Sequence, residues 1–342
     1  MARGAGGRVA VLGSANADLV IGVARLPAPG ETVLAGSLQT IPGGKGANQA
    51  AAAARLGAPT EFLGRVGDDG NGGMLLAALR GAGAGTAAAV EAAGEPSGTA
   101  AVFLLPGGEN SIVVCGGANM SEAWELTPAM RAELEAASVL LLQREVPEKV
   151  NAAAAQAAKG VAGAGPATVV LDAGGADGPL SPELLAAVDV LSPNETELAR
   201  ITGLPTDTDD QVVAASKALL NRTGSGVAAV ITKLGARGSI FVGDPGLGAA
   251  EGGARREVWF QPALSVANVV DTTGAGDCYT AAVGSRLAAG VPVAEAMRFA
   301  SAAGALCVQT LGAMPSMPSL AETQELAETW PDGGGASRSL EA

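Results

Sequence analysis

Histidine is absent from the 342 residues, and its absence excludes several kinds of catalytic site. Without an imidazole, the chain cannot form a Ser-His-Asp triad, a Cys-His pair or a histidine-ligated metal centre. Any general base must therefore be the side chain of an Asp, Glu, Lys, Tyr or Cys residue. Aromatic residues are also scarce, at 3%, so the core has to be packed from Val, Leu, Ile and Ala.

Cysteine is scarce as well. Cys115, Cys278 and Cys307 are odd in number and far apart, a pattern that favours neither a disulfide framework nor a zinc knuckle. We therefore expect a reducing compartment, either the cytoplasm or, if a transit peptide has been removed, the plastid stroma. The first residues lack the apolar core of a secretory signal, and no apolar run is long enough to span a bilayer.

Basic residues are outnumbered by acidic ones. The chain has 21 Lys and Arg against 34 Asp and Glu, for a net charge of −13. Because neither a basic nucleic-acid footprint nor a polybasic membrane patch is present, we expect no nucleic-acid partner and no membrane partner. An acidic chain that handles an anionic ligand must gather positive potential locally, from helix ends, a few Lys or Arg side chains and metal ions.

The order of apolar segments predicts an α/β fold. From residue 139 onward, short apolar strands alternate with helices, which is typical of a mostly parallel sheet covered by helices on both faces. Strands around 24–42 and 99–115 do not fit this alternation, and we interpret them as a small β-sheet lid. The Gly- and Ser-rich tail, 331–342, is expected to be disordered. The predicted strands are 8–12, 18–23, 32–34, 37–42, 60–66, 99–105, 111–115, 139–143, 168–172, 188–191, 228–232, 239–242 and 257–260, and the predicted helices are 47–56, 71–80, 148–159, 182–187, 194–202, 210–223, 276–289 and 292–308.

The segment DTTGAGD, from Asp271 to Asp277, carries the strongest chemical signal. Because Gly274, Ala275 and Gly276 have little or no side chain, a ligand can approach their backbone closely. Their N–H groups, at the start of a helix, would bind the negative charge of a transferring phosphate. Asp277 could then accept the proton of an attacking hydroxyl, as phosphoryl transfer requires. Alternatively, Asp277 only stabilises the first turn of its helix.

A second polar group follows the first strand. Asn16 and Asp18 occupy alternate positions of an extended segment, so both can face one site. A carboxylate can accept hydrogen bonds from two neighbouring hydroxyls, so Asp18 would recognise a vicinal diol. Further along the chain, Gly44 permits close approach of the backbone, and Lys45 and Asn48 would add donors. The alternative is a solvated Asp18 at a strand start, with an ordinary lysine after a glycine turn.

Four segments together resemble the signatures of the ribokinase-like (PfkB) carbohydrate kinases. DTTGAGD is similar to the family's C-terminal signature, and SPNETE at 192–197 is similar to its metal-associated motif. GSANAD at 13–18 and GGKGANQA at 43–50 are similar to the N-terminal signature of the ribose-specific members. The segments occur in the family's order and spacing, and the resemblance covers roughly residues 8–320, so chance agreement of all four would be rare.

The resemblance implies a ribokinase-like, three-layer α/β/α kinase domain over 8–320, with a mostly parallel central sheet and a small β-sheet lid over the sugar. It also implies transfer of the γ-phosphate of ATP to a sugar hydroxyl with Mg²⁺ and, in many members, activation by K⁺. The lysine in GGKGANQ favours D-ribose, phosphorylated at O5 to give ribose 5-phosphate and ADP, over the ketohexose of fructokinase-like members. Another pentose, a nucleoside or a ketohexose stays open, as does a non-catalytic sugar-binding regulator. Exposed edges of a small lid favour a homodimer that forms through the lid.

The resemblance further implies roles for individual residues. The catalytic residues would be Asp277, as the base, and Gly274, Ala275 and Gly276, whose backbone would bind the anion. The sugar contacts would be Asn16, Asp18, Gly44, Lys45, Asn48, Glu145 and Asp277. The nucleotide contacts would be Asn194, Lys233, Gly235, Gly276 and Ser301. Glu197 would organise waters around Mg²⁺. The K⁺ site would be formed by Asp271, Thr273, Cys307, Thr310, Gly312 and Ser316.

Some nucleotide assignments have simpler explanations or depart from the family pattern. Asn194 and Glu197, three residues apart on one helix face, are also a good capping box, and both roles can hold together. Gly235 fits a plain hairpin turn equally well. Lys233 stands where bacterial members often have Thr, and Ser301 stands where relatives often have His or Asn.

Overall fold

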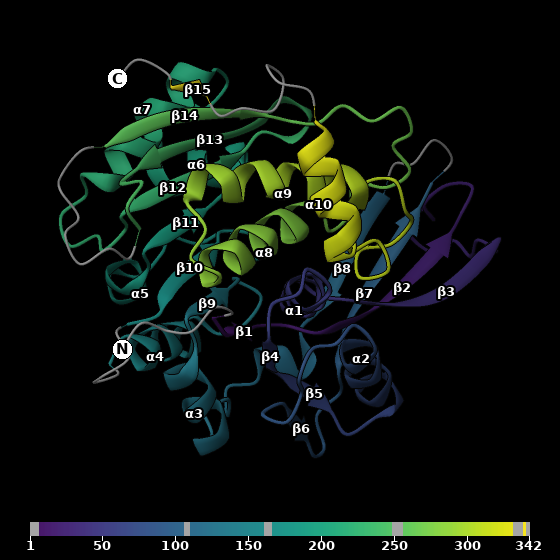
Figure 1. Ribbon diagram of the computed structural model, residues 1–342. Helices are drawn as coiled ribbons and strands as arrows, with labels where there is room; N and C mark the ends of the chain where they lie inside the picture. Colours follow the sequence, from purple (N-terminus) through teal and green to yellow (C-terminus); the bar gives the residue numbers. More distant parts are fainter. Residues whose placement is uncertain (1–6, 106–109, 161–165, 248–255, 331–337, 340–342) are drawn as a thin grey trace.

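The computed structural model describes residues 7–105, 110–160, 166–247, 256–330 and 338–339, and a nine-stranded sheet lies at the centre of this part of the chain (Figure 1). Its strands, in chain order, are β1 (Val9–Leu12), β4 (Thr60–Leu63), β9 (Val139–Leu142), β10 (Thr168–Asp172), β11 (Val190–Ser192), β12 (Ala229–Lys233), β13 (Gly238–Gly243), β14 (Glu257–Pro262) and β15 (Arg338–Ser339). They lie side by side in the order β15-β14-β13-β12-β11-β10-β9-β1-β4. The strands from β12 to β4 are parallel, and β13, β14 and β15 extend the sheet in antiparallel fashion.

Side chains of the sheet alternate between two cores. In β1, Val9 and Val11 belong to one buried cluster, whereas Ala10 and Leu12 belong to the other. Because both faces of the strand are apolar, helices have to cover both faces of the sheet. The first face carries α1 (Lys45–Arg55), α2 (Gly70–Gly81), α8 (Ala275–Ala288), α9 (Val293–Cys307) and α10 (Leu320–Thr329), and the second carries α3 (Pro128–Ala136), α4 (Glu148–Lys159), α5 (Pro182–Ala187), α6 (Glu195–Thr202) and α7 (Asp209–Leu220). The predicted three-layer α/β/α architecture is confirmed.

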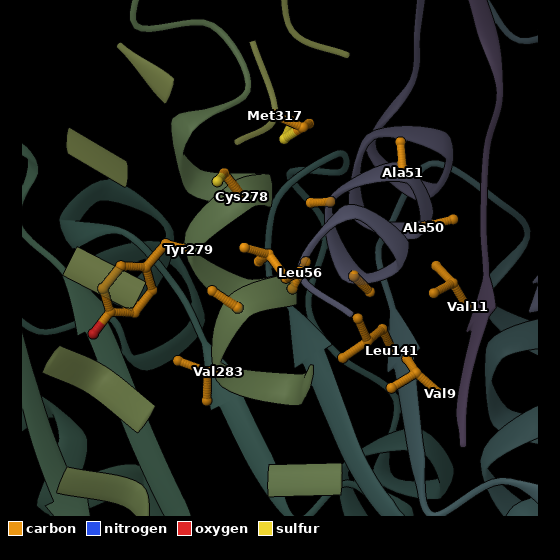
Figure 2. Close-up of a cluster of buried hydrophobic side chains, with 14 of the residues drawn as sticks. Val9, Val11, Ala50, Ala51, Leu56, Leu141, Cys278, Tyr279, Val283 and Met317 are labelled. Carbon is orange, nitrogen blue, oxygen red and sulfur yellow. The ribbon is translucent and has the colours of Figure 1, made fainter. Parts of the chain in front are cut away.

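Small residues bring α1 and α8 close to the sheet. Figure 2 shows Ala50 and Ala51 of α1 and Val283 of α8 in the same buried cluster as Leu141 of β9. A Cβ atom on Gly284 would lie 2.6 Å from Cδ2 of Leu141, so a glycine is needed for this close approach. The Ala-rich composition thus fixes α8, and the residues at its N-terminus, against the central strands.

A second sheet of four strands lies beside the central sheet (Figure 1). It is formed by β2 (Asn16–Gly22), β3 (Ser37–Gly43), β7 (Gly98–Leu104) and β8 (Asn110–Cys115), in the order β3-β2-β7-β8. We call these four strands the lid sheet. Its β2 and β7 are parallel, and its other pairs are antiparallel. The lid sheet therefore includes β2, which directly follows β1 in the chain.

The predicted strand at 32–34 is wrong. Residues 31–35 form no regular structure, and the side chain of Leu34 is 91% exposed. The physical reason is that the chain around Gly36 turns toward β2 instead of folding back on itself. β3 pairs along its whole length with β2, and the N–H of Gly36 donates to the carbonyl of Gly22.

Two helices, α3 and α10, are absent from the sequence-based prediction although both carry start signals. Thr127 caps α3 through a hydrogen bond from a backbone N–H, with a proline in the first turn. Ser319 and Glu322 form a capping box at the start of α10. A further two-stranded sheet, β5 (Arg65–Gly67) with β6 (Val90–Ala92), completes the described structure.

The tail, predicted to be disordered from residue 331, falls largely outside the described residues. The exception is β15, whose two residues pair with Trp259 and Phe260 of β14. Across the described residues, none of the helices combines the length and apolarity needed to cross a membrane.

The carboxyl edge of the parallel strands holds the predicted site residues. The chain passes from β1 to β4 on one side and later returns to β9 on the other side of β1, which creates a topological switch point. In open α/β sheets, ligands bind in the crevice outside the strand ends at such a point. Asn16 follows β1, Glu145 follows β9, Asn194 follows β11 and Lys233 ends β12, so all four lie at this edge.

Candidate active site

Asp277 lies in the first turn of α8, and its side chain contacts α1. It is buried, with 4% exposure, and Oδ2 accepts a hydrogen bond of 2.9 Å from Nδ2 of Asn48. Nε2 of Gln49 and Nζ of Lys45 lie 3.5 Å and 3.3 Å from Oδ1. The N-cap of α8 is Gly274, without a side-chain cap. Asp277 is therefore not used for capping, and donors from a second helix fix the direction of its carboxylate.

The backbone at the start of α8 has open hydrogen-bond donors. Gly274 has a left-handed φ of 81°, and a Cβ atom there would lie 2.8 Å from Cβ of Ala313, so the turn requires glycine. The N–H of Ala275, one of the three predicted anion-binding amides, donates to the carbonyl of Thr272. Within the described residues, the N–H groups of Gly276 and Asp277 have no partner. These two amides provide an anion-binding position at the helix N-terminus.

The GGKG turn is held to the end of β9. The N–H of Lys45 donates to Oε2 of Glu145 at 3.0 Å, and the hydroxyl of Ser14 donates to the same oxygen at 2.5 Å. Gly44 has a φ of 88°, and a Cβ atom there would lie 2.7 Å from the backbone nitrogen of Asn16. The glycine is thus required both by the turn and by the adjacent β2.

Asn48 offers an acceptor without a partner. Its Nδ2 is used by Asp277, but Oδ1 is buried and accepts no hydrogen bond within the described residues. An unsatisfied buried acceptor is costly, so a bound hydroxyl that donates to it would relieve the penalty. The atom lies next to the carboxylate of Asp277, which places a ligand hydroxyl and the candidate base together.

Asp18 belongs to the same group of acidic residues. Its Oδ2 lies 2.1 Å from the position that a Cβ atom on Gly43 would take, so that glycine makes room for the carboxylate. Burial, followed by repulsion from Glu145 and Asp277, raises the pKa of Asp18 to about 7. Three carboxylates from β2, α8 and the loop after β9 thus converge on one site, as the sequence predicts.

Asn16 lies in this region but is bound to a residue that the sequence analysis does not identify. Its Oδ1 accepts a hydrogen bond of 2.8 Å from Nδ2 of Asn119, which lies in a short 3₁₀ helix (Gly117–Met120). Oδ1 of Asn119 also accepts from the backbone N–H of Ala15. Asn119 therefore fixes the beginning of β2, and with it the position of Asp18.

A cavity of about 750 Å³ extends from Lys45 along α8 toward α9. All the predicted nucleotide contacts line it, namely Asn194, Lys233, Gly235, Gly276 and Ser301. The charged lining residues include Lys45, Asp172, Glu197 and Lys233, and the apolar ones include Val266, Val269, Ala305 and Val308. The volume and the mixed lining suit a ligand with a charged part and a flat apolar part.

Lys233 is bound by a carboxylate that was not predicted. Its Nζ lies 2.6 Å from Oδ2 of Asp172, which is 1% exposed, and Nζ of Lys45 lies 3.9 Å from Oδ1. Burial alone would raise the pKa of Asp172, but attraction to Lys233 and Lys45 outweighs it and lowers the pKa to about 2. Burial likewise tends to lower the pKa of Lys45, and its carboxylate neighbours Asp277, Asp172 and Glu145 reverse the effect and raise it. Asp172 thus lies between the ammonium groups of Lys45 and Lys233.

Asn194 and Glu197 form the capping box of α6. Oδ1 of Asn194 accepts from the N–H of Glu197, and Oε2 of Glu197 accepts from the N–H of Asn194, both at 2.8 Å. The capping alternative is therefore confirmed. Oε1 of Glu197 lies close to Gly174, 2.9 Å from the position of a Cβ atom there, and Glu197 lines the cavity. One carboxylate oxygen is used for capping, and the other is available for waters or a ligand.

The residues predicted for the K⁺ site lie in two segments that contact each other. Asp271 accepts hydrogen bonds of 2.9 Å from the N–H groups of Thr273 and Gly312. In the second segment, the N–H of Thr310 donates to the carbonyl of Cys307, and Sγ of Cys307 lies 3.0 Å from the hydroxyl of Ser316. The described residues contain no group of three or more His, Cys, Asp or Glu side chains that could hold a metal. A cation here would depend on backbone carbonyls.

Residues 7–320 match the model of the pfkB family carbohydrate kinases. The chain belongs to this family. A ribokinase from Arabidopsis thaliana is 45% identical over 313 residues, which cover 90% of this chain and 78% of the relative. A ribokinase from Haemophilus influenzae is 36% identical over 320 residues, which cover 93% and 97%. The solved structure of Arabidopsis thaliana ribokinase complexed with ribose and ATP matches with a TM-score of 0.84 at 42% identity, and the match covers 94% of this chain and 99% of that one.

This pfkB-family carbohydrate kinase also contains polar residues in the site that sequence reasoning missed. Nε2 of Gln143 donates to Oε1 of Gln49 at 2.7 Å, and the carbonyl of Gln143 accepts from Nδ2 of Asn151. The amide of Gln49 in turn approaches Asp277. A signal for Gln49 is present, because it follows Asn48 in the GGKGANQA motif. Gln143 and Asn151 are ordinary in sequence, and they gain a role only when the end of β9 meets α1 on one side and α4 on the other.

The raised pKa of Asp18 predicts how the stability of the ligand-free kinase depends on pH. The pKa is about 7 in the folded state and 3.8 ordinarily, so between these values the folded state retains a proton that the unfolded chain releases. The contribution of the Asp18 carboxyl group to the stability of the folded state is therefore complete below pH 3.8, and it is lost as the pH rises through 7. Asp18→Asn removes this dependence. In urea unfolding, the free energy of unfolding of the variant minus that of wild type should increase by on the order of 2 kcal/mol from pH 5 to pH 8. An equal difference between the two proteins at both pH values would contradict the assignment.

Proposed function

We propose that this kinase phosphorylates D-ribose at O5 with ATP and releases ribose 5-phosphate and ADP. The observation that carries the proposal is the convergence of Asp18, Asn48 and Asp277 on one side of the α8 N-terminus, with a cavity of nucleotide size on the other. The lysine-containing GGKGANQ turn and the two similar ribokinases support ribose as the sugar.

The sugar would be oriented by hydrogen bonds that complete unsatisfied groups. Asp18 would accept from the hydroxyls on C2 and C3, whose donation favours its charged form. Asn48 Oδ1, which lacks a donor within the described residues, would accept from a third hydroxyl. A sugar without the vicinal diol would leave Asp18 buried and unpaired, so the site would reject it.

Asp277 would act as the base. Its carboxylate, held by Asn48 and Lys45, would accept the proton of the 5-hydroxyl while that oxygen attacks the γ-phosphorus. The amides of Gly276 and Asp277 would stabilise the negative charge that develops on the transferring phosphoryl group. Ser301, Gly235 and Asn194 would contact the nucleotide along the cavity. The chain supplies mainly positioning and charge stabilisation, which phosphoryl transfer needs most.

Two cations are proposed as cofactors. The open Oε1 of Glu197, which lines the same cavity as Asp172, fits Mg²⁺ held through waters, and Mg²⁺ would neutralise charge on the ATP phosphates. The K⁺ site would be formed by the segments that contain Asp271, Thr273, Cys307, Thr310, Gly312 and Ser316. Because Asp271 links its own loop to Gly312, a cation bound there would stiffen the turn that leads into α8.

We also propose a reducing compartment, such as the cytoplasm or the plastid stroma. The three cysteines are free thiols in the structure, which supports this proposal.

The proposed function predicts a clear order of sugar preference. In a coupled ADP-release assay, D-ribose should give the highest kcat/KM, and 2-deoxyribose should fall about 10²-fold or more because it cannot pair both oxygens of Asp18. Phosphorus NMR should place the product phosphate on O5. A fructose or nucleoside preference would overturn ribose as the substrate. Absence of ADP release with every sugar would support a non-catalytic binding protein instead.

The role of Asp277 predicts that Asp277→Asn folds normally and loses kcat by about 10²–10⁴-fold, because a neutral amide cannot accept the proton. The KM for ATP should change by less than about threefold. Glu295→Gln is the matched control, since Glu295 is an exposed carboxylate in the first turn of the neighbouring α9 and should be silent. A kcat for Asp277→Asn within about tenfold of wild type, a barrier change under ~1.4 kcal/mol, would remove Asp277 as the base.

We propose that the protein forms a homodimer, in which two copies pair through their lid sheets. Its edge strand β8 exposes Ile112, Val113 and Val114 in succession, so both faces of the strand carry open apolar side chains, and β3 exposes Leu38. Such an edge and surface favour pairing with a second copy. Light scattering should give a dimer at micromolar concentration, and Leu38→Glu with Val114→Glu should give a folded monomer. A wild-type monomer under these conditions would refute the proposal.

A further inference from the structure

Asp172 is a buried carboxylate at the phosphate end of the cavity, and nothing in the motifs points to it. It ends β10 and lines the cavity with 1% of its surface exposed. Oδ1 accepts from the N–H of Gly174 at 2.9 Å, and Oδ2 accepts from the hydroxyl of Thr280 at 3.0 Å and from Nζ of Lys233 at 2.6 Å. Nζ of Lys45 lies 3.9 Å from Oδ1. Each oxygen therefore has a neutral donor and a cationic neighbour.

The two lysines that share Asp172 lead to different parts of the reaction centre. Lys45 reaches from α1, and its Nζ is 3.3 Å from Oδ1 of the proposed base, Asp277. Lys233 reaches from β12, and its Nζ is 3.7 Å from the position that a Cβ atom on Gly276 would take. One ammonium group thus lies beside the carboxylate that would receive the proton. The other lies near Gly276, one of the two residues whose amides would bind the transferring phosphoryl group.

Among the described residues that line the cavity, Lys45 and Lys233 are the two with basic side chains. The same lining contains Glu195 and Glu197, and the whole chain carries a net charge of −13. A triphosphate has to enter this acidic surrounding, so the positions of Lys45 and Lys233 decide how well its charge is met. A lysine side chain is flexible, and an unanchored ammonium would follow whichever carboxylate is nearest.

The helix that carries Asp277 also anchors Asp172. Thr280 lies three residues after Asp277 in α8, so the two side chains share one helix face. The hydroxyl of Thr280 contacts Ser192 of β11 at 3.0 Å and Nζ of Lys233 at 3.3 Å as well as Asp172. A buried carboxylate with these fixed partners has one orientation, and that orientation is tied to the first turn of α8.

We propose that Asp172 is a positioning residue for phosphoryl transfer. Its carboxylate holds Lys45 on the base side and Lys233 on the phosphate side of the α8 N-terminus, at a fixed separation. The inference rests on the proposed function, because it assigns Asp172 to that reaction. It also explains why Lys233 is engaged by a carboxylate: the pair sets the place of the ammonium before the nucleotide arrives.

The test measures kcat and KM for ribose and ATP in wild type, Asp172→Asn, Asp172→Glu and Lys233→Met. Asp172→Asn keeps the shape and removes the charge, and kcat should fall about 100-fold, since misplacement by about 1 Å has that effect. The KM for ribose should change far less than kcat, because Asp18 and Asn48 are untouched and Lys45 keeps its contact with Asp277. Asp172→Glu keeps the charge but moves it by one methylene group, so it should also lower kcat. If Asp172→Asn does not fold, the kcat of Asp172→Glu is compared with that of wild type instead.

A matched control separates positioning from general stability. Asp189 also binds a lysine, with 2.5 Å between Nζ of Lys159 and Oδ1, but at the opposite, amino-terminal end of β11. Asp189→Asn should lower Tm and leave kcat unchanged. In the Lys233→Met background, Asp172→Asn should lower kcat by only about tenfold, because part of its effect acts through the lysine that is already gone.

The outcomes distinguish this inference from the proposed function. If wild type transfers phosphate and both Asp172 variants retain its kcat, the inference is overturned and the proposed function stands. The inference is also overturned if kcat falls no further in Asp172→Asn than in Asp189→Asn. It is overturned as well if the loss of kcat in the double variant equals the product of the losses in Asp172→Asn and Lys233→Met. If wild type releases no ADP with any sugar, the proposed function fails and the inference fails with it.

Discussion

The meeting of the α1 and α8 N-termini is the constraint on which the site depends. Each helix begins after a left-handed glycine, Gly44 or Gly274, and each directs its first turn toward the same volume. The partial positive charge of both N-termini then favours negative groups between them. Asp277 is such a group, and its hydrogen bond from Asn48 links the two helices directly. The Ala-rich packing of α1 and the close contact at Gly284 hold both helices on the sheet.

Two aspartates of the site have very different pKa values, because their surroundings differ. Asp172 is a buried carboxylate and Asp18 a half-buried one, yet the pKa of Asp172 falls to about 2 and that of Asp18 rises to about 7. The difference follows from their neighbours: Asp172 lies between two ammonium groups, whereas Asp18 faces two other carboxylates. The charged form of Asp172 is thus favoured, which suits it to anchoring cations. The other awaits a donor, which is the condition for recognising hydroxyl groups.

Most of the architecture, and the grouping of Asp18, Asn48 and Asp277 in one region, could be predicted from the sequence, because the signals are local. The GGKGANQ turn and DTTGAGD each place their reactive groups within a few residues, where backbone conformation decides the outcome. Asp172, Gln143 and Asn119 could not be found in this way. Asp172 gains its role from Lys233 and Thr280, which are 61 and 108 residues away in the chain. The strand predicted at 32–34 failed for a related reason, since the pairing of β2 with β3 and β7 is a long-range property.

The position of Asp18 connects the lid sheet to the chemistry. β2 starts at the switch point, within the polar edge of the central sheet, and then continues as an inner strand of the lid sheet, between β3 and β7. Its third residue is the carboxylate whose charged form is disfavoured without a partner. Under the proposed function, a sugar that donates to Asp18 would therefore stabilise the charged form of a group fixed to the lid sheet, while its remaining hydroxyls would face Asn48 and Asp277 on the helices. Because one small ligand would satisfy a group on the lid sheet together with groups on α1 and α8, binding energy at a non-reacting diol would align the reacting hydroxyl with the base.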